Sequence, residues 1–311
     1  MSNLNNRYTR RVFFLGWLIL TLTLGLAGAA VGEEEAETVA TPAQKQRAVV
    51  SSGLGSDVIA AQRPDTAIWL DLEGDGAELA LFEPELEAPA KGAVLMLADE
   101  GQSAASELLG ALGEPFAANG WGVMTLGLEA PPYELQRAWR LADARRPERQ
   151  EDESQDPSSV MIDVMEDGEL EDAEDQYRTR IQDRLSAAAT NLQERGYERI
   201  VLVGVGAAAM HVARSAAAGT GDQLIWVAPR FYPADESALG ELLASVGALP
   251  VLDMHSARPQ VASLSPRKRA ARLKKAGAQG YQLQLVGTGV RPEPREAAML
   301  ANRIQSWLRS I

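Results

Sequence analysis

The chain of 311 residues contains no cysteine and only two histidines. Without cysteine it can form no disulfide, carry no lipid on a cysteine and hold no metal through a thiolate. Histidine is the side chain whose ordinary pKa suits a general base near neutral pH, and this chain offers only His211 and His255. These absences narrow the chemistry before any motif is considered.

The chain also has few basic residues relative to acidic ones, and the imbalance is local. Its formal net charge is −13, and residues 148–175 carry thirteen acidic side chains against one basic side chain, Arg149. The remainder is nearly neutral, so the sequence lacks the basic surface of a nucleic-acid-binding protein. We expect residues 148–175 to form a disordered acidic insert, because like charges at this density repel one another.

Residues 1–29 have the features of a signal peptide for export. Arg7, Arg10 and Arg11 precede an apolar stretch at 12–26, and 27–29 read Ala-Gly-Ala, a typical cleavage site. We expect cleavage after Ala29 and a periplasmic or otherwise exported protein, by the general or the twin-arginine route. A membrane span needs about twenty apolar residues, so an inner-membrane anchor formed by residues 12–29 is the alternative.

Beyond the signal, residues 30–66 lack periodicity and are expected to be a flexible linker. Apolar runs and amphipathic segments then alternate through residues 67–311. Two runs around residues 73–76 predict a β-hairpin. Further strands are expected at 93–98, 123–128, 200–203, 224–228, 251–254 and 281–286, and helices at 106–118, 175–195, 237–246, 266–276 and from 294. This order predicts an α/β domain with a mostly parallel sheet and helices on both faces.

Residues 199–213 predict a strand, a sharp turn and a helix of small residues. This is the pattern of a nucleophile elbow, in which G-x-S-x-G presents a serine above the sheet of an α/β-hydrolase. Gly206 stands where the serine would be. Glycine has no side chain with which to attack a substrate.

Three segments carry a resemblance to a known family: residues 93–102 (AVLMLADEGQ), residues 119–122 with the strand VMTLGL, and residues 199–213. Over most of residues 67–311 the chain resembles the α/β-hydrolase fold. More narrowly, it resembles a bacterial family of exported α/β-hydrolase-like proteins of unknown function. The resemblance implies the fold and no particular activity.

The same resemblance locates the three catalytic positions of such enzymes in this chain. The nucleophile position falls on Gly206, the acid position on Pro259 and the histidine position on Val290. None of these residues can perform the role. We therefore expect no catalytic triad.

The remaining candidates for a pocket lie near the elbow. Residues 99–103 correspond to the loop that lines the oxyanion hole of catalytic relatives. The candidate pocket residues are Asp99, Glu100, Gln102, Ser103, Gly204, Ala207 and His255. Ser103 as a relocated nucleophile, with His211 or His255 as its base, would make the chain an active hydrolase.

We expect no cofactor and no bound metal. The Gly204-Val205-Gly206 sequence has Ala209 where a dinucleotide-binding loop requires glycine. A calcium loop over residues 163–174 would use Asp163, Asp167, Glu169 and Glu174, but Met165 occupies a ligand position. An acid-rich stretch matches part of this pattern by chance.

These observations favour an exported pseudoenzyme that binds or scaffolds, with a small molecule or an envelope protein as partner. The first alternative is an ester or amide hydrolase with a relocated nucleophile. The second is an envelope interaction protein that acts through its acidic insert.

The signal is directly testable. We expect the native protein to begin at Ala30, because the short apolar stretch is followed at once by an Ala-Gly-Ala site. N-terminal sequencing of protein purified from its own cells would show this. A sequence starting at Met1 or Ser2, together with recovery in the membrane fraction, would instead establish the uncleaved anchor.

Overall fold

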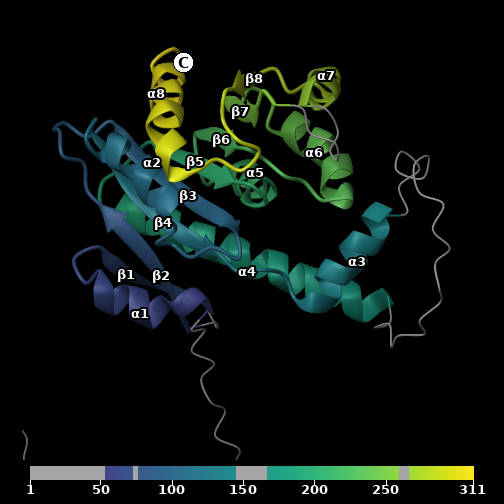
Figure 1. The fold of residues 1–311 in the computed structure, drawn as a ribbon, viewed down its shortest axis with the longest axis horizontal. Helices are drawn as coiled ribbons and strands as arrows, with labels where there is room; N and C mark the ends of the chain where they lie inside the picture. The colour runs from purple at the N-terminus through teal and green to yellow at the C-terminus, as the bar shows by residue number, and fades with distance from the viewer. Residues whose placement is uncertain (1–52, 73–75, 145–166, 259–265) are drawn as a thin grey trace, which may run out of the picture. The chain divides into compact units, whose positions relative to one another are not determined.

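The structure is a computed structural model that describes residues 53–72, 76–144, 167–258 and 266–311 (Figure 1). The expected signal peptide, most of the expected linker and residues 148–166 of the acidic segment lie outside these ranges. None of the helices in the described ranges is long and apolar enough to cross a membrane.

An eight-stranded sheet runs through the domain in the order β1-β2-β4-β3-β5-β6-β7-β8. The strands are β1 (Ala67–Leu72), β2 (Gly76–Glu83), β3 (Gly92–Glu100), β4 (Trp121–Leu128), β5 (Ile200–Val205), β6 (Gln223–Val227), β7 (Val251–Ser256) and β8 (Tyr281–Val286). The pairs β1–β2 and β2–β4 are antiparallel, and the other pairs are parallel. The predicted hairpin and the mostly parallel sheet are confirmed.

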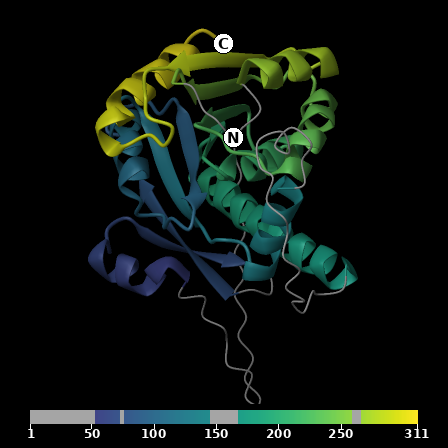
Figure 2. The same cartoon turned by 45° about the vertical axis from the view of Figure 1, so that its right-hand side comes forward.

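Helices cover both faces of the sheet. They are α1 (Ser56–Gln62), α2 (Glu107–Ala117), α3 (Tyr133–Ala144), α4 (Asp167–Glu194), α5 (Ala208–Ala217), α6 (Pro233–Ser245), α7 (Pro266–Ala276) and α8 (Ala297–Leu308), with short 3-10 turns η1 (Gly53–Gly55) and η3 (Pro294–Glu296). Helices α2 and α8 pack together on one face, whereas α4, α5, α6 and α7 follow one another on the other (Figures 1 and 2). The predicted fold class is confirmed.

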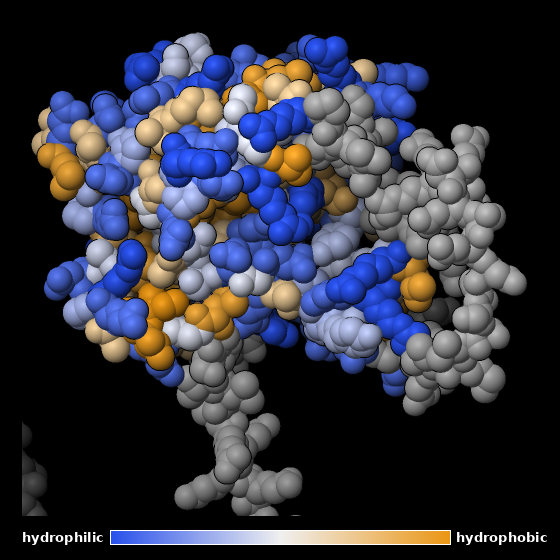
Figure 3. Space-filling model, in the orientation of Figure 1, coloured by the Kyte–Doolittle hydropathy of each residue, from blue (hydrophilic) through white to orange (hydrophobic). Residues whose placement is uncertain are grey.

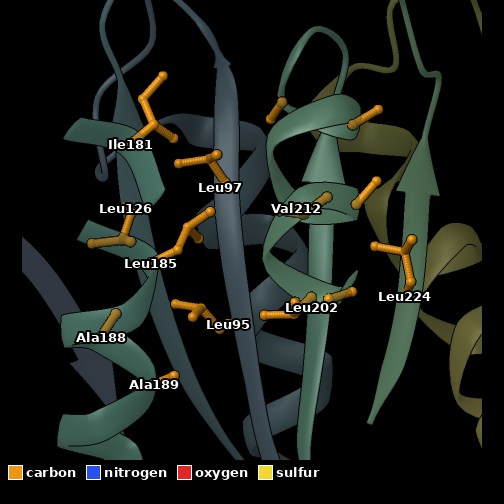
Figure 4. Close-up of a cluster of buried hydrophobic side chains, with 14 of the residues drawn as sticks. Leu95, Leu97, Leu126, Ile181, Leu185, Ala188, Ala189, Leu202, Val212 and Leu224 are labelled. Atoms are coloured by element: carbon orange, nitrogen blue, oxygen red, sulfur yellow. The ribbon is translucent and has the colours of Figure 1, made fainter. Parts of the chain in front are cut away.

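The central strands are apolar on both sides because both sides are covered. Along β3, Leu95 and Leu97 point to the face of α4 and α5, while Val94 and Met96 point to the face of α2 and α8. Figure 4 shows Leu95 and Leu97 beside Leu185 of α4. Fully burying such a side chain contributes about 1.5–3 kcal/mol, so these layers hold the strand ends, and therefore the site, in place.

Helix α4 begins at Asp167, which corrects the expected extent of the disordered acidic insert (148–175) and the expected helix start at 175. Leu170 and Ala173 pack against the core, and Tyr177 is buried one turn later. Glu174 also forms an ion pair with Arg178 one turn along the helix. The apolar spacing therefore outweighs the repulsion between the acids in the first turns.

Two further helices lie where the sequence analysis expected none. Helix α1 falls within the expected linker (30–66), and its Ile59 and Ala60 pack against a small cluster that includes Leu79 and Leu81. Helix α3 follows Pro131-Pro132, and its Leu135 is fully buried. Both helices are short and bury few residues, which makes their periodicity weak in the sequence.

The face seen in Figure 3 is mainly hydrophilic, with hydrophobic residues in small patches between charged ones. Trp69 of β1 and Tyr133 of α3 are among the large apolar side chains left exposed. Isolated exposed apolar residues of this kind are normal on a protein surface.

Candidate functional site

The elbow joins β5 to α5 through Gly206, whose φ of +58° lies in the left-handed region that favours glycine. Its N–H donates to the carbonyl of Val227 at 3.0 Å. Two residues earlier, a Cβ on Gly204 would lie 2.5 Å from Val212 of α5. Gly204 is therefore needed for helix and strand to pack closely, and Gly206 for the turn between them.

The side chain of Asp99, at the end of β3, lies over Gly206. A Cβ on Gly206 would stand 2.2 Å from Oδ1 of Asp99, 2.3 Å from its Cγ and 2.6 Å from its Oδ2. Real Cβ atoms do not approach other atoms so closely. The carboxylate therefore occupies the space in which a side chain at position 206 would begin, and it would have to move away from its donors to make room.

Three donors converge on Oδ1 of Asp99. The N–H of Ala207 donates at 2.9 Å, the N–H of Glu100 at 2.8 Å and the guanidinium of Arg230 at 2.6 Å. In α/β-hydrolases the oxyanion hole is formed by the N–H after the nucleophile and an N–H from the loop after β3. Ala207 follows the elbow glycine, and Glu100 is the last residue of β3, directly before that loop. The corresponding donors are thus already engaged by a carboxylate of the same chain.

Arg230 is brought to this point by an unusual turn after β6. Ala228 has a φ of +49°, a left-handed conformation that costs a residue with a Cβ about 1–2 kcal/mol. The N–H of Arg230 then donates to the carbonyl of Gly206 at 3.0 Å. Arg230 therefore holds the elbow twice, by its backbone and through its ion pair with Asp99.

A cavity of about 370 Å³ opens beside this cluster, within the range of about 300–1,000 Å³ typical of ligand pockets. It lies at the carboxyl ends of parallel strands, where ligands bind in open α/β sheets. Its lining residues are Asp99, Glu100, Gln102, Ser106, Leu108, Leu109, Val205, Gly206, Ala228, Arg230, Val290, Arg291 and Pro292.

Several residues singled out in the sequence meet in this cavity. Asp99, Glu100 and Gln102 line it together with two of the three catalytic positions, Gly206 and Val290. Val290 is half-exposed at 47 %. Pro259, at the acid position, lies outside the described residues. The two described residues at which the resemblance expects catalytic side chains thus line one cavity, and neither glycine nor valine offers a side chain for catalysis.

The other pocket candidates lie nearby without lining the cavity formed by the described residues. Ala207 contributes its N–H to Asp99, and Gly204 provides close packing. Ser103 sits in the turn before α2, where its carbonyl accepts from the N–H of Ser106. His255 is buried within β7, and burial lowers its pKa.

The second candidate base, His211, lies in α5 against the ring of Tyr177, at 5.7 Å between ring centroids. Burial, reinforced by the charges of Arg214 and Arg178, lowers its pKa from 6.5 to about 3. An imidazole with so low a pKa is a weak base. The neutral ring of His211 packs between α5 and α4.

The calcium hypothesis falls on a segment that is helical from Asp167 onward. Asp163 lies outside the described residues, Glu169 is exposed and Glu174 is paired with Arg178. The described residues contain no group of three or more histidine, aspartate or glutamate side chains placed to hold a metal. Residues 167–174 form the start of α4 and do not follow the course of a calcium-binding loop.

Sequence reasoning missed Arg230 and Arg291. Both lie in loops after strands, at β6 and β8, where the residues of an α/β site are expected. Their position after a predicted strand was the only indication in the sequence that they belong to the site. The pairing of Arg230 with Asp99 joins residues 131 positions apart, and no local pattern encodes it.

Comparison with known families identifies the family of this chain. A family model described as "Protein of unknown function (DUF3530)" matches residues 15–310. The chain therefore belongs to this family, whose activity is not known. No curated protein sequence matches the chain significantly.

Solved structures share the fold at low sequence identity. The esterase domain of a Rhodothermus marinus protein has a TM-score of 0.52 at 10 % identity, covering 78 % of this chain and 97 % of its own. Est1E from Butyrivibrio proteoclasticus has a TM-score of 0.51 at 11 % identity, covering 79 % and 98 %. A dienelactone hydrolase from Anabaena variabilis has a TM-score of 0.50 at 15 % identity, covering 78 % and 96 %. These similarities establish the α/β-hydrolase fold and no activity.

The exclusion between Asp99 and a side chain at position 206 can be measured. We expect Gly206→Ala to lower the free energy of unfolding by about 2–4 kcal/mol, through left-handed strain and displacement of the carboxylate from its donors. In an Asp99→Ala background the same substitution should cost only the strain, about 1–2 kcal/mol. Urea unfolding of all four proteins gives the coupling between the two sites.

Gly247→Ala is the matched control, because Gly247 has a φ of +54° and no atom within 4 Å of an added Cβ. It reports the strain alone. If Gly206→Ala cost no more than this control, or cost the same with and without Asp99, the proposed overlap would be wrong.

The low pKa of His211 predicts a pH dependence of stability. The unfolded chain binds a proton at about pH 6.5, whereas the folded chain does not until about pH 3. His211 should therefore leave stability intact above pH 6.5 and reduce it as the pH falls, by up to about 1.4 kcal/mol per pH unit. His211→Gln should flatten the decline between pH 6 and 4 in urea unfolding. His255 stays in both proteins, so its contribution cancels, and identical pH profiles would contradict the assignment.

Proposed function

We propose that this member of the family is an exported pseudoenzyme that uses the cavity at its former catalytic centre to bind a ligand without hydrolysing it. One observation carries the proposal: the carboxylate of Asp99 stands where a nucleophile would begin and accepts from both N–H groups at the oxyanion-hole positions. Oxyanion stabilisation is usually the largest single contribution to acyl transfer, and here those donors are engaged.

The charge on Asp99 also argues against covalent chemistry at this point. A carboxylate beside the developing oxyanion would repel it, which raises the barrier to attack on an ester. Asp99 itself is a poor nucleophile, because Arg230 and two N–H groups draw on the charge of its Oδ1. The geometry therefore supports binding more than turnover.

The alternative of a relocated serine gains little support. Ser103 lies in the turn that leads into α2, and it does not line the cavity that the described residues form. Desolvation lowers the pKa of both His211, which is partly buried, and His255, which is buried. A nucleophile needs a base within about 2.6–3.2 Å, and His211 lies instead against the ring of Tyr177.

Export remains part of the proposal on the evidence of residues 1–29, with the periplasm as the compartment. An envelope protein or a small molecule could occupy the cavity from there. The cavity, rather than the acidic segment, is the feature that the described residues support.

The proposal predicts an unreactive site. We expect the mature protein neither to label with a fluorophosphonate probe nor to hydrolyse p-nitrophenyl butyrate above the rate in buffer. Loss of a triad alone still leaves about 10³–10⁴-fold acceleration where the oxyanion hole is intact. Because Asp99 engages these donors, even that remainder should be missing.

An active esterase treated in parallel shows that the reagents work. Covalent label mapped to Ser103, lost in Ser103→Ala, would establish the relocated nucleophile and reject the proposal. An acyl adduct mapped to Asp99 would reject it as well.

A further inference from the structure

The cavity beside Asp99 is lined by both apolar and polar residues. Leu108 and Leu109 from α2, with Val290 and Pro292 from the loop after β8, supply apolar surface. Glu100, Gln102 and the two arginines supply polar groups. A ligand that fits such a cavity has an apolar body and a polar head. The apolar body covers the apolar lining residues, and the polar head forms hydrogen bonds with the polar ones.

The charges of the polar lining residues are unevenly matched. Asp99 is held by Arg230 and two N–H groups. The carboxylate of Glu100 accepts from the hydroxyl of Tyr232, which keeps that carboxylate occupied but leaves its charge in place. Among the described residues, Arg291 makes no ion pair, so its guanidinium is a positive charge in the lining that can pair with an anionic head.

The backbone that carries Arg291 is fixed in place. The carboxylate of Glu296 accepts from the N–H of Gly289 at 3.0 Å and from the N–H of Glu293 at 2.9 Å. These two bonds bracket the loop on both sides of Arg291. A pre-organised loop loses little entropy when a ligand binds.

We propose that the cavity binds a small amphipathic carboxylic acid, with its carboxylate on Arg291 and its apolar body against Leu108, Val290 and Pro292. Arginine suits this role because its planar guanidinium can donate two parallel hydrogen bonds to one carboxylate. The inference rests on the proposed non-catalytic role of the same cavity and specifies its ligand.

Equilibrium dialysis of the mature protein with radiolabelled octanoate tests the proposal. We expect saturable binding with one octanoate per chain, and an affinity at least tenfold above that for octanamide, which has the same chain and no charge. Arg291→Gln should weaken octanoate at least tenfold and leave octanamide unchanged. Arg295→Gln, at a 78 % exposed side chain four residues along the loop, is the matched control and should bind octanoate as the native protein does.

Val290→Asp provides a second variant that should fold, because Val290 is 47 % exposed. It places a carboxylate next to the apolar lining residues and should abolish octanoate binding without changing the melting temperature. Equal affinity for octanoate and octanamide, no effect of Arg291→Gln, or no saturable binding would each overturn the inference. Should octanoate fail to bind while the protein stays inert to esters and to the fluorophosphonate probe, the ligand assignment falls and the loss of catalysis stands.

Discussion

One side chain, Asp99, determines what the centre of this protein can do. Its carboxylate lies within 2.2 Å of the point where a Cβ on Gly206 would be. Every other feature of the site follows from that contact. Glycine at position 206 leaves room for the carboxylate. The N–H groups of Ala207 and Glu100 are engaged, and Arg230 reaches across to balance the charge of a partly buried acid. The left-handed turn at Ala228 brings Arg230 there.

The elbow persists because it is part of the architecture. Gly204 allows α5 to approach β5, and Val212 of α5 packs over Leu202 and Leu224 in the core (Figure 4). A serine at the turn would add strain of about 1–3 kcal/mol, whereas glycine adopts the same backbone freely. Replacing the nucleophile with glycine therefore removes chemistry while preserving the packing of strand on helix.

The sequence predicted the strands well because each central strand is apolar on both faces and bounded by turns. Two residues that the sequence analysis singled out, Gly206 and Val290, line the same cavity. The sequence analysis failed at the C-terminal end of the acidic segment, where Leu170 and Ala173 were outnumbered by charged neighbours, and at the short helices α1 and α3. The role of Asp99 was out of reach, since it depends on β3 and β5 being neighbours in the sheet. Asp99 could be assigned to the loop after β3, but not placed over position 206.

The same contact governs what a substitution at position 206 would do. A serine there would meet the carboxylate of Asp99, so the carboxylate would have to leave its donors or be removed. Losing the acid would leave the guanidinium of Arg230 without its partner at the centre of the site. A base would still be needed at Val290, which projects none. Each single step costs stability or gains nothing in rate, so the arrangement of Asp99, Gly206 and Arg230 is locally self-consistent. Its members hold one another in place through the hydrogen bonds and the ion pair at Asp99.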